Sequence, residues 1–374
     1  MSAESGATGP SVSSLRERLD EIDARIMELV AERQATVASI GEQKHAEGRG
    51  LRDFVREREV IELGMRRAES LGMRGDIARD ILERLIHHSL SNQEQRQLVR
   101  SGHGAGSRAL VIGGKGRMGD WMARYLDTVG YTVEIADPAS GDSLFPSTPD
   151  WRDSELDHDV IVVAAPLRDT NEVLKALAEI GPPGLVFDVG SLKAPLREGL
   201  EAMRAAGCRI ASVHPMFGPD ALMLSGRHIL LVSAGHAQAL HEAAELFSHT
   251  AAECVELDLE DHDEVMAWVL SLAHLVNIAF AAALSRSGAR SGVLRDISSS
   301  TFDAQLKVAG QVVSENPRLY FEIQQGTAGH GPAIAAFTSA MEDLLRSIRE
   351  DDESMFVEIM AQAHQHLAAK DESA

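Results

Sequence analysis

Cysteine and positive charge are both scarce in this chain of 374 residues. Cysteine occurs only at Cys208 and Cys254, which are too few for a disulfide framework and do not form a C-x-x-C pair. The 36 lysine and arginine residues are outnumbered by 57 aspartate and glutamate residues, so the formal net charge is -21. Nucleic acid and anionic membranes attract basic surfaces, and this balance argues against both as partners. We therefore expect a protein of the reducing cytoplasm.

The N-terminus lacks the features of a signal peptide, and no apolar run is a clear membrane span. Residues 1–14 are small and polar, with no basic or apolar region, and are expected to form a disordered tail. The longest apolar run, 267–284, approaches the length of a membrane span. Ser271, His274 and Asn277 interrupt it, and an acidic stretch precedes it. We expect this run to be a buried helix and the protein not to enter a membrane.

A dinucleotide-binding fingerprint lies in the middle of the chain. Residues 109–119 combine a short apolar strand with a G-x-G-x-x-G pattern, which permits a tight turn and close approach of the backbone to a pyrophosphate. An amphipathic helix and a second strand follow, and Asp137 ends that strand where a carboxylate can accept a hydrogen bond from the ribose. The predicted cofactor is NAD, and the predicted cofactor-binding residues are Gly114, Gly116, Arg117, Met118, Gly119 and Asp137.

A helical unit precedes this fingerprint. Apolar residues recur at helical spacing over about thirty residues from Leu15. A break at Gly48 and Gly50 and two further helices, over about 53–70 and 76–98, follow. One long helix and two shorter ones cannot bury this apolar stripe alone, which predicts a helical dimer. We place this unit at 15–100 and a Gly/Ser-rich linker at 101–107.

The remaining chain divides into an α/β domain, expected at 108–258, and an all-α region at 259–374. Short apolar strands at 160–166, 185–193 and 210–219 are separated by helices, which indicates a parallel sheet with ligands at the carboxyl ends of its strands. Ser191 and His214 lie at two such ends. Helices are expected at 263–284 and 341–367. His364 and His366, two residues apart, point to different helix faces, so no metal site is expected.

Basic residues of the first helix lie where they could hold a dianion. Arg33 and Lys44 are eleven residues apart, which puts them on one helix face about 16 Å apart. Together with Leu15-Arg16-x-x-Leu-Asp20, Arg52-Asp53-x-x-Arg56-Glu57 and Ser89-x-x-x-Gln93, they resemble the all-helical chorismate mutases. The resemblance implies that Arg33 and Arg16 of the partner subunit hold the substrate carboxylates, supported by Arg56 and Ser89. It also implies that Lys44 and Gln93 donate to the ether oxygen, while Glu57 and the Asp53 backbone hold the ring hydroxyl.

The second half carries a different resemblance. Asp188-Val-Gly-Ser191-x-Lys193 and His214-Pro-Met-Phe-Gly-Pro219 are similar to prephenate dehydrogenases, over residues 108 to about 325. The order of the two units resembles the fused T-protein type of tyrosine biosynthesis. The resemblance implies conversion of chorismate to prephenate and of prephenate to 4-hydroxyphenylpyruvate by a homodimer joined through its C-terminal helices. His214 would accept a hydrogen bond from the ring C4 hydroxyl, and Ser191 would orient the pair.

One position departs from the dehydrogenase pattern. Asp303 stands where the family places an arginine that binds a carboxylate, and Lys307 lies one helical turn further on the same face. We expect Lys307 to take over the carboxylate contact. Two alternatives remain open from the sequence. The dehydrogenase could act on arogenate or another 4-amino analogue, or the protein could be a regulator that senses NAD without turnover.

Overall fold

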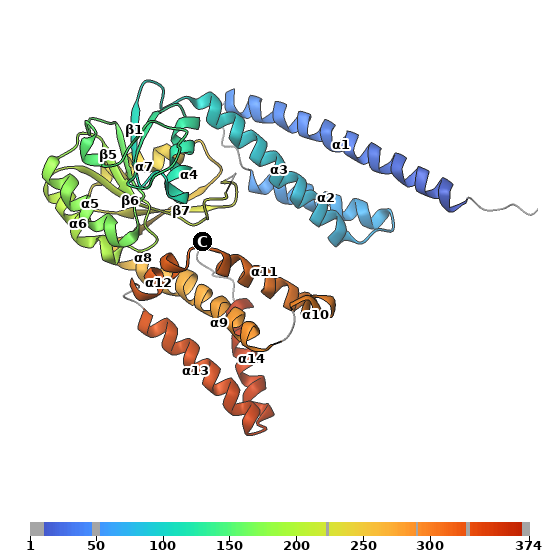
Figure 1. Cartoon of the computed structure of the whole chain (residues 1–374). Coiled ribbons are helices and arrows are strands. Elements are labelled where there is room, and N and C mark those ends of the chain that lie inside the picture. Colours follow the sequence, from blue (N-terminus) through green and yellow to red (C-terminus); the bar gives the residue numbers. More distant parts are fainter. Residues whose placement is uncertain (1–10, 47–52, 222–223, 289–290, 327–329, 369–374) are drawn as a thin grey trace, which may run out of the picture.

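The computed structural model describes residues 11–46, 53–221, 224–288, 291–326 and 330–368. Three helices, a domain built on one large sheet and a second group of helices follow one another along the chain (Figure 1). This succession confirms the predicted fold class: an all-α unit, an α/β Rossmann domain and an all-α C-terminal region.

The first unit contains α1 (Val12–Ala46), α2 (Phe54–Ser70) and α3 (Gly75–Ser101). The expected disordered tail is wrong for its last residues, because α1 begins at Val12. Ser11 explains this start, since its hydroxyl accepts a hydrogen bond from the Ser14 backbone N–H at 3.2 Å. The predicted break at Gly48 and Gly50 lies outside the described residues.

Helix α1 leaves a long apolar stripe exposed. Its C-terminal half contacts α3 through the hydrogen bonds of Arg33 and of the Val37 carbonyl. Figure 1 shows its N-terminal half extending away from the other helices, and the apolar side chains of that half are exposed in the single chain. About half of the surface of these side chains is accessible: Leu15, Leu19, Ile22, Ile26 and Leu29. Among the described residues of one chain, nothing covers the apolar stripe that the sequence indicated.

The segment predicted as a linker, 101–107, forms a turn that is docked on the α/β domain. Gly102 ends α3 in the left-handed conformation, with φ 47°. The Gly104 N–H donates to the Val129 carbonyl at 3.0 Å, and the Thr132 N–H donates to the Ser107 carbonyl at 2.9 Å. A Cβ on Gly104 would lie 2.2 Å from the Tyr131 ring, so glycine permits the close approach. The glycines of the predicted linker thus allow tight packing on the α/β domain.

The α/β domain is an eight-stranded sheet in the order β3-β2-β1-β4-β5-β6-β7-β8. Its first six strands have the order of a dinucleotide-binding sheet. The predicted strands β4, β5 and β6 are parallel, as the sequence indicated, and β7, which the sequence analysis did not predict, runs antiparallel to β6. The strands are β1 (Arg108–Ile112), β2 (Thr132–Ala136), β3 (Ser147–Thr148), β4 (Val160–Val163), β5 (Leu185–Asp188), β6 (Arg209–Pro215), β7 (His228–Ser233) and β8 (Glu253–Asp258).

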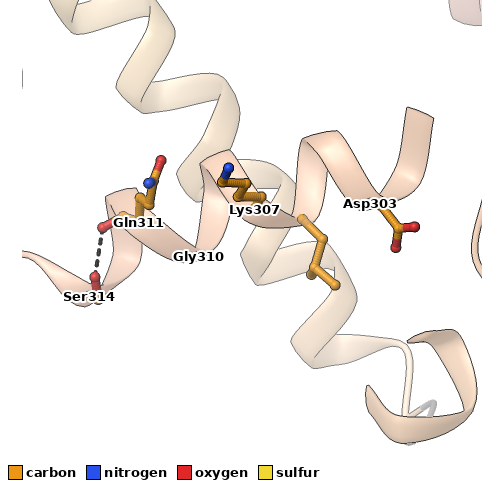
Figure 2. Close-up of a pocket in the computed structure, with 6 residues that line it drawn as sticks. Asp303, Lys307, Gly310, Gln311 and Ser314 are labelled. Atoms are coloured by element: carbon orange, nitrogen blue, oxygen red, sulfur yellow. Dashed lines mark hydrogen bonds between the residues drawn. The ribbon is translucent and has the colours of Figure 1, made fainter. Parts of the chain in front are cut away.

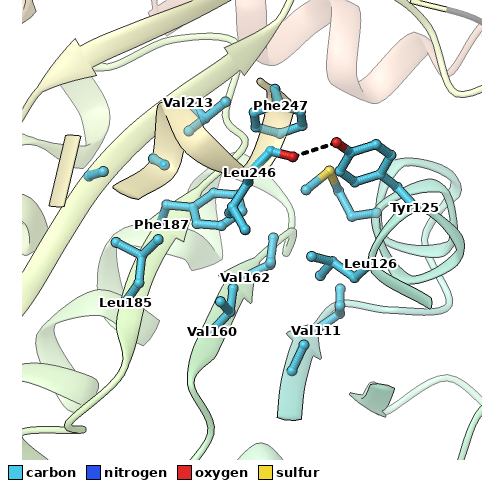
Figure 3. Packing of buried hydrophobic residues seen from close by; sticks show 14 of the residues in the cluster. Val111, Tyr125, Leu126, Val160, Val162, Leu185, Phe187, Val213, Leu246 and Phe247 are labelled. Atoms are coloured by element: carbon cyan, nitrogen blue, oxygen red, sulfur yellow. Dashed lines mark hydrogen bonds between the residues drawn. The ribbon is translucent and has the colours of Figure 1, made fainter. Parts of the chain in front are cut away.

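Helices cover both faces of this sheet. On one face, α4 (Arg117–Thr128) and α7 (Ala237–Phe247) pack on buried strand residues, and the Tyr125 hydroxyl donates to the Leu246 carbonyl at 2.6 Å (Figure 3). On the other face lie α5 (Leu167–Ile180), α6 (Arg197–Ala205) and the short η2 (Ala194–Leu196). Because helices cover both faces, the central strands β1, β4 and β5 are almost wholly buried, and ligands reach this part of the sheet at the strand ends.

The C-terminal helices begin with one continuous run. It comprises α8 (Leu259–Met266), a π-helical turn (Ala267–Leu272) and α9 (Ala273–Arg286). Within the described part of the chain, it is the one helix long and apolar enough for a membrane span, with mean hydropathy 1.9. We expected a buried helix, but only 22% of its most apolar window is buried in the single chain.

The remaining helices are α10 (Ser291–Asp296), α11 (Ser300–Ser314), α12 (Pro317–Gly326), α13 (His330–Arg349) and α14 (Glu353–Ala368). The single helix expected at 341–367 is wrong. Asp351 adopts the left-handed conformation at φ 57°, and the Asp352 carboxylate accepts from the Met355 N–H at 3.0 Å. Asp352 thus caps a new helix, which the acidic run of the sequence did not reveal.

Candidate active sites

The helical unit brings Arg33 and Ser89 together between α1 and α3. The Arg33 guanidinium donates to the Ser89 hydroxyl at 3.0 Å, and the Ser89 hydroxyl donates to Gln34 Oε1 at 2.9 Å. Ser89 is buried and Arg33 is half-buried. Burial lowers the pKa of Arg33 from its usual value, but arginine remains charged in proteins. The pair therefore offers a fixed cation and a hydroxyl to a carboxylate.

Two further predicted residues, Gln93 of α3 and Lys44 of α1, lie near the same C-terminal half of α1. Gln93 donates from Nε2 to the Val37 carbonyl at 2.6 Å. A Cβ on Gly41 would lie 2.7 Å from that Nε2, so the glycine allows Gln93 to lie against α1. Lys44 Nζ is 3.9 Å from Asp53 Oδ2, which joins the end of α1 to the start of α2. Hydrogen-bond donors thus converge on the C-terminal half of α1.

Other predicted residues of this site do not join that group. Arg16 is exposed and lies about 25 Å before Arg33 along the helix, at 1.5 Å per residue. Arg56 is exposed and forms an ion pair with Glu59 at 3.0 Å. Glu57 is half-buried in the first turn of α2. A second chain would be needed to bring an arginine from the position of Arg16 to this group.

The glycine-rich loop after β1 requires one more glycine than the sequence analysis assigned. Gly113 has φ 85°, and a Cβ there would lie 2.6 Å from the Ala164 carbonyl oxygen. A Cβ on Gly119 would lie 2.1 Å from the Gly113 carbonyl oxygen. Gly116, the N-cap of α4, is more open, with its closest contact at 3.1 Å. The loop leaves the amino end of α4 accessible, where backbone N–H groups favour an anion.

Asp137 and Arg117 flank this loop in different ways. The Asp137 carboxylate accepts from the Lys115 N–H at 3.0 Å and from the Ala139 N–H at 2.8 Å, and it retains lone pairs for a hydroxyl. Arg117 forms ion pairs with Asp220 at 2.8 Å and with Glu315. The hydrogen bond to Asp220 raises the pKa of Arg117. Arg117 therefore links the loop to the C-terminal helices, while Met118 is half-buried beside it.

Ser191 follows β5, and His214 is the second-last residue of the neighbouring strand β6, so both lie toward the carboxyl edge of the sheet. Strands β5 and β6 are parallel, with Asp188 opposite Ser212, so both residues lie at the edge that carries the glycine loop. His214 is 4% exposed and Ser191 is half-buried. Burial, Lys193 and His262 together hold the pKa of His214 well below its usual value. His214 is consequently neutral at physiological pH.

A buried ion pair below His214 was not assigned a role from the sequence. Lys193 and Asp188 are both 0% exposed, and Lys193 Nζ lies 2.7 Å from Asp188 Oδ1 and 3.0 Å from the Val213 carbonyl oxygen. Ser212 donates to the second oxygen of Asp188. Burial lowers the pKa of Lys193, and Asp188 opposes that shift. The pair ties β5 to β6 directly below the histidine.

A second histidine contacts His214, which the sequence analysis also missed. His214 Nδ1 lies 3.0 Å from His262 Nε2, and His262 Nδ1 lies 2.6 Å from Asp263 Oδ1. Burial lowers the pKa of His262, and the hydrogen bond to Asp263 opposes that shift. The two histidines are 48 residues apart in sequence, so no local spacing could reveal this contact.

Known proteins match this chain in the same order of units. The family model of type II chorismate mutases matches residues 15–94, and the models of the prephenate dehydrogenase nucleotide-binding and dimerization domains match 145–256 and 258–362. The T-protein of Enterobacter agglomerans is 25% identical over 360 residues, covering 92% of this chain and 90% of that protein. The T-protein of Haemophilus influenzae is 25% identical over 358 residues, covering 93% and 90%.

The chain belongs to the bifunctional chorismate mutase–prephenate dehydrogenase family. It therefore has both enzyme activities and acts in tyrosine biosynthesis. A prephenate dehydrogenase from A. aeolicus, solved with hydroxyphenyl propionate and NAD+, has the same fold at TM-score 0.57 and 20% identity. That likeness covers 70% of this chain and 96% of that chain. The glycine loop precedes the matched nucleotide-binding range, so its assignment depends on its geometry.

The departure from the dehydrogenase pattern lies on α11. Asp303 and Lys307 are both exposed and line an open groove on this helix, together with Gly310, Gln311 and Ser314 (Figure 2). Asp303 Oδ1 accepts a hydrogen bond from Ser298. In the described part of the chain, no hydrogen bond or ion pair joins Lys307 to His214 or Ser191. The carboxylate contact of Lys307 stays a prediction.

Proposed function

We propose that the helical unit rearranges chorismate to prephenate, and that the sheet domain and C-terminal helices oxidise prephenate to 4-hydroxyphenylpyruvate with NAD. One observation carries the second assignment most directly. Buried, neutral His214 lies at the same sheet edge as the open glycine loop at the start of α4. This arrangement can hold a dinucleotide next to a hydrogen-bond acceptor.

The first reaction needs positioning and charge rather than a nucleophile. A Claisen rearrangement proceeds when the substrate is held compactly and growing negative charge on its ether oxygen is stabilised. We assign the carboxylates to Arg33, assisted by Ser89, because an arginine fork binds a carboxylate through two hydrogen bonds. Lys44 and Gln93 are assigned as donors to the ether oxygen.

The other predicted mutase residues belong to this proposal as well. Arg16 of the partner subunit would supply the second carboxylate contact, and Arg56 would support it. Glu57 and the Asp53 backbone would hold the ring hydroxyl. The hydrogen bond between Arg33 and Ser89 and the ion pair of Lys44 with Asp53 support the placement of the site on α1.

The residues of the loop fit NAD. Gly116 would leave room for the pyrophosphate at the amino end of α4, with Gly114, Met118 and Gly119 shaping the turn. The Asp137 carboxylate would accept from the ribose 2'-hydroxyl and would repel the 2'-phosphate of NADP. Bound NAD supplies the hydride acceptor.

His214 would accept the proton of the ring C4 hydroxyl while the ring carboxylate leaves as CO2. Ser191 would orient the hydroxyl toward the imidazole. A neutral histidine suits this role, because the acceptor must carry a free lone pair before the reaction. The lowered pKa of His214 supports this assignment.

We further propose a homodimer in the cytoplasm. The unpartnered apolar stripe of α1 and the match to a dehydrogenase dimerization domain support the dimer. Lys307 would bind a substrate carboxylate beside Asp303. Arogenate or another 4-amino analogue is the second candidate substrate, because its ammonium group could pair with the exposed Asp303 carboxylate.

Supplying chorismate with and without NAD tests the proposal. Mass spectrometry should show prephenate alone without NAD, and 4-hydroxyphenylpyruvate with NADH when NAD is present. Prephenate that stays unconsumed with NAD, while added arogenate is oxidised, would assign the dehydrogenase to the amino substrate.

A further inference from the structure

The hydrogen bonds around Asp263 determine which atom of His262 carries a proton. Asp263 Oδ1 accepts from the Lys193 backbone N–H at 2.9 Å, and Oδ2 accepts from the Ala194 backbone N–H at 2.6 Å. A carboxyl group that receives donors on both oxygens is held as the carboxylate. An ionised carboxylate only accepts, so the Nδ1 of His262, 2.6 Å away, must donate.

The same reasoning extends to His214. A neutral histidine that donates from Nδ1 has a lone pair on Nε2. His262 Nε2 is 3.0 Å from His214 Nδ1, so His214 must donate from Nδ1 across this contact. The Nε2 of His214 then carries the lone pair. A protonated Nε2 on His214 would leave no acceptor for a substrate hydroxyl.

We propose that His262 and Asp263 are positioning residues that hold His214 in the Nδ1–H tautomer, with Nε2 free to accept the C4 hydroxyl proton of the substrate. The inference rests on the proposed role of His214. Neither residue needs to touch the substrate, because both act through the imidazole ring.

The charges around the histidines agree with this assignment. Lys193 and Asp188 form a paired cation and anion below His214, and Asp263 is the carboxylate that faces His262 from α8. Lys193 disfavours a positive charge on either ring, whereas Asp263 favours one on His262. Both rings are therefore neutral before reaction. When His214 accepts the substrate proton, its Nδ1–H remains donated to His262, and the Asp263 carboxylate lies beyond it.

A matched pair of substitutions separates tautomer control from packing. In His262→Gln, Oε1 can still accept from His214 while Nε2 donates to Asp263. In His262→Met, a side chain of similar size offers no comparable acceptor. We expect His262→Met to lower kcat roughly 10- to 100-fold, part of the roughly 10²- to 10⁴-fold that a positioned base contributes. His262→Gln should retain most of the activity, and KM for NAD should stay unchanged in both variants.

Nitrogen-15 NMR of histidine-labelled protein gives a readout that packing alone would not move. The His214 signals are assigned by their loss in His214→Asn. We expect protonated Nδ1 and unprotonated Nε2 on His214 in the natural chain and in His262→Gln, and protonated Nε2 or a tautomer mixture in His262→Met. An unchanged thermal unfolding midpoint of the sheet domain and unchanged NAD affinity in each variant show that the dehydrogenase domain is folded.

Two results would overturn the inference. One is a His214 that carries its proton on Nε2 in the natural chain. The other is a His262→Met variant with natural kcat, or with the same loss as His262→Gln and an unchanged tautomer. The role of His214 itself is tested separately. His214→Asn should lower kcat roughly 10²- to 10⁴-fold with NAD affinity retained, and a natural kcat there would refute the proposed function instead.

Discussion

Burial sets the protonation state of several histidines in the dehydrogenase part of the chain. The pKa values of His214 and His262 are lowered from 6.5, and that of His274 is lowered to about 4, in each case chiefly by burial. The imidazolium form is penalised because removal from water costs a charged group more than a neutral one. A neutral histidine has an unprotonated ring nitrogen that can accept a hydrogen bond. Burial, which disfavours the imidazolium form, therefore also maintains this acceptor.

This burial predicts that the protein loses stability in mild acid. Between pH 6.5 and about 4, the unfolded chain binds protons at these positions that the folded chain does not, so the free energy of unfolding falls as pH falls. Urea unfolding at pH 7.5, 6 and 5 should show this decrease. His274→Phe, which preserves an aromatic contact with Tyr320, should weaken it. Stability that is constant over this range would contradict the assignment.

Lys307 gives a second prediction at the residue scale. A hydrogen bond to a charged group is worth about 1.5 to 3 kcal/mol, so Lys307→Ala should lower kcat/KM for prephenate roughly 10- to 100-fold. Asp303→Arg should preserve or improve prephenate use, because it restores a cation where Asp303 repels a carboxylate. If Lys307→Ala is neutral and arogenate is the better substrate of the natural chain, the carboxylate role of Lys307 is wrong.

At the scale of elements, glycines in the loop between β1 and α4 have two different roles: one permits a backbone conformation, and the other leaves space for a ligand. Gly113 is required by a positive φ and by contact with Ala164, whereas Gly116 has ordinary dihedral angles and a Cβ there would meet only the Gly113 carbonyl oxygen, at 3.1 Å. Gly113→Ala should therefore destabilise the sheet domain by roughly 1 to 3 kcal/mol, the usual cost of a strained backbone position.

Gly116→Ala is the matched control for this loop. It should lose less stability than Gly113→Ala but bind NAD more weakly, since its methyl group would occupy the space proposed for the pyrophosphate. Thermal unfolding and NAD titration by fluorescence measure the two effects. Equal loss of stability in both variants, with unchanged NAD affinity for Gly116→Ala, would contradict the loop's proposed role.

The elements show why sequence patterns predict some features of this fold and not others. The three N-terminal helices, α4 and β2 follow from apolar periodicity, which is local. The reversal of β7 depends on which neighbour it pairs with, and the break between α13 and α14 depends on a cap at Asp352. His214, Ser191 and the glycines could be predicted from the sequence, because they lie at the ends of apolar strands. His262 and Asp263 could not, because only the packing of α8 on the sheet brings them to His214.

At the scale of the whole molecule, the two groups of site residues belong to separate units. The mutase residues are in α1 to α3, and the dehydrogenase residues lie at one edge of the sheet. Lys44→Ala should therefore abolish mutase activity while dehydrogenase activity on added prephenate survives. Spectrophotometric assays of chorismate loss and NADH formation test this directly. Parallel loss of both activities in a folded variant would indicate a shared site.

The docked turn at 102–107 has a consequence for how the intermediate travels. It delivers the chain to the amino end of β1, whereas Gly113 and Ser191 lie at the opposite, carboxyl edge, about 16 Å further for a five-residue strand. We therefore expect prephenate to be released into solvent between its formation and its oxidation. NADH should appear from chorismate only after a lag, and an excess of a competing prephenate-consuming enzyme should intercept the molecule. Fusion of the two enzymes in one chain would then give equal numbers of mutase and dehydrogenase sites. It would not transfer prephenate directly from one site to the other.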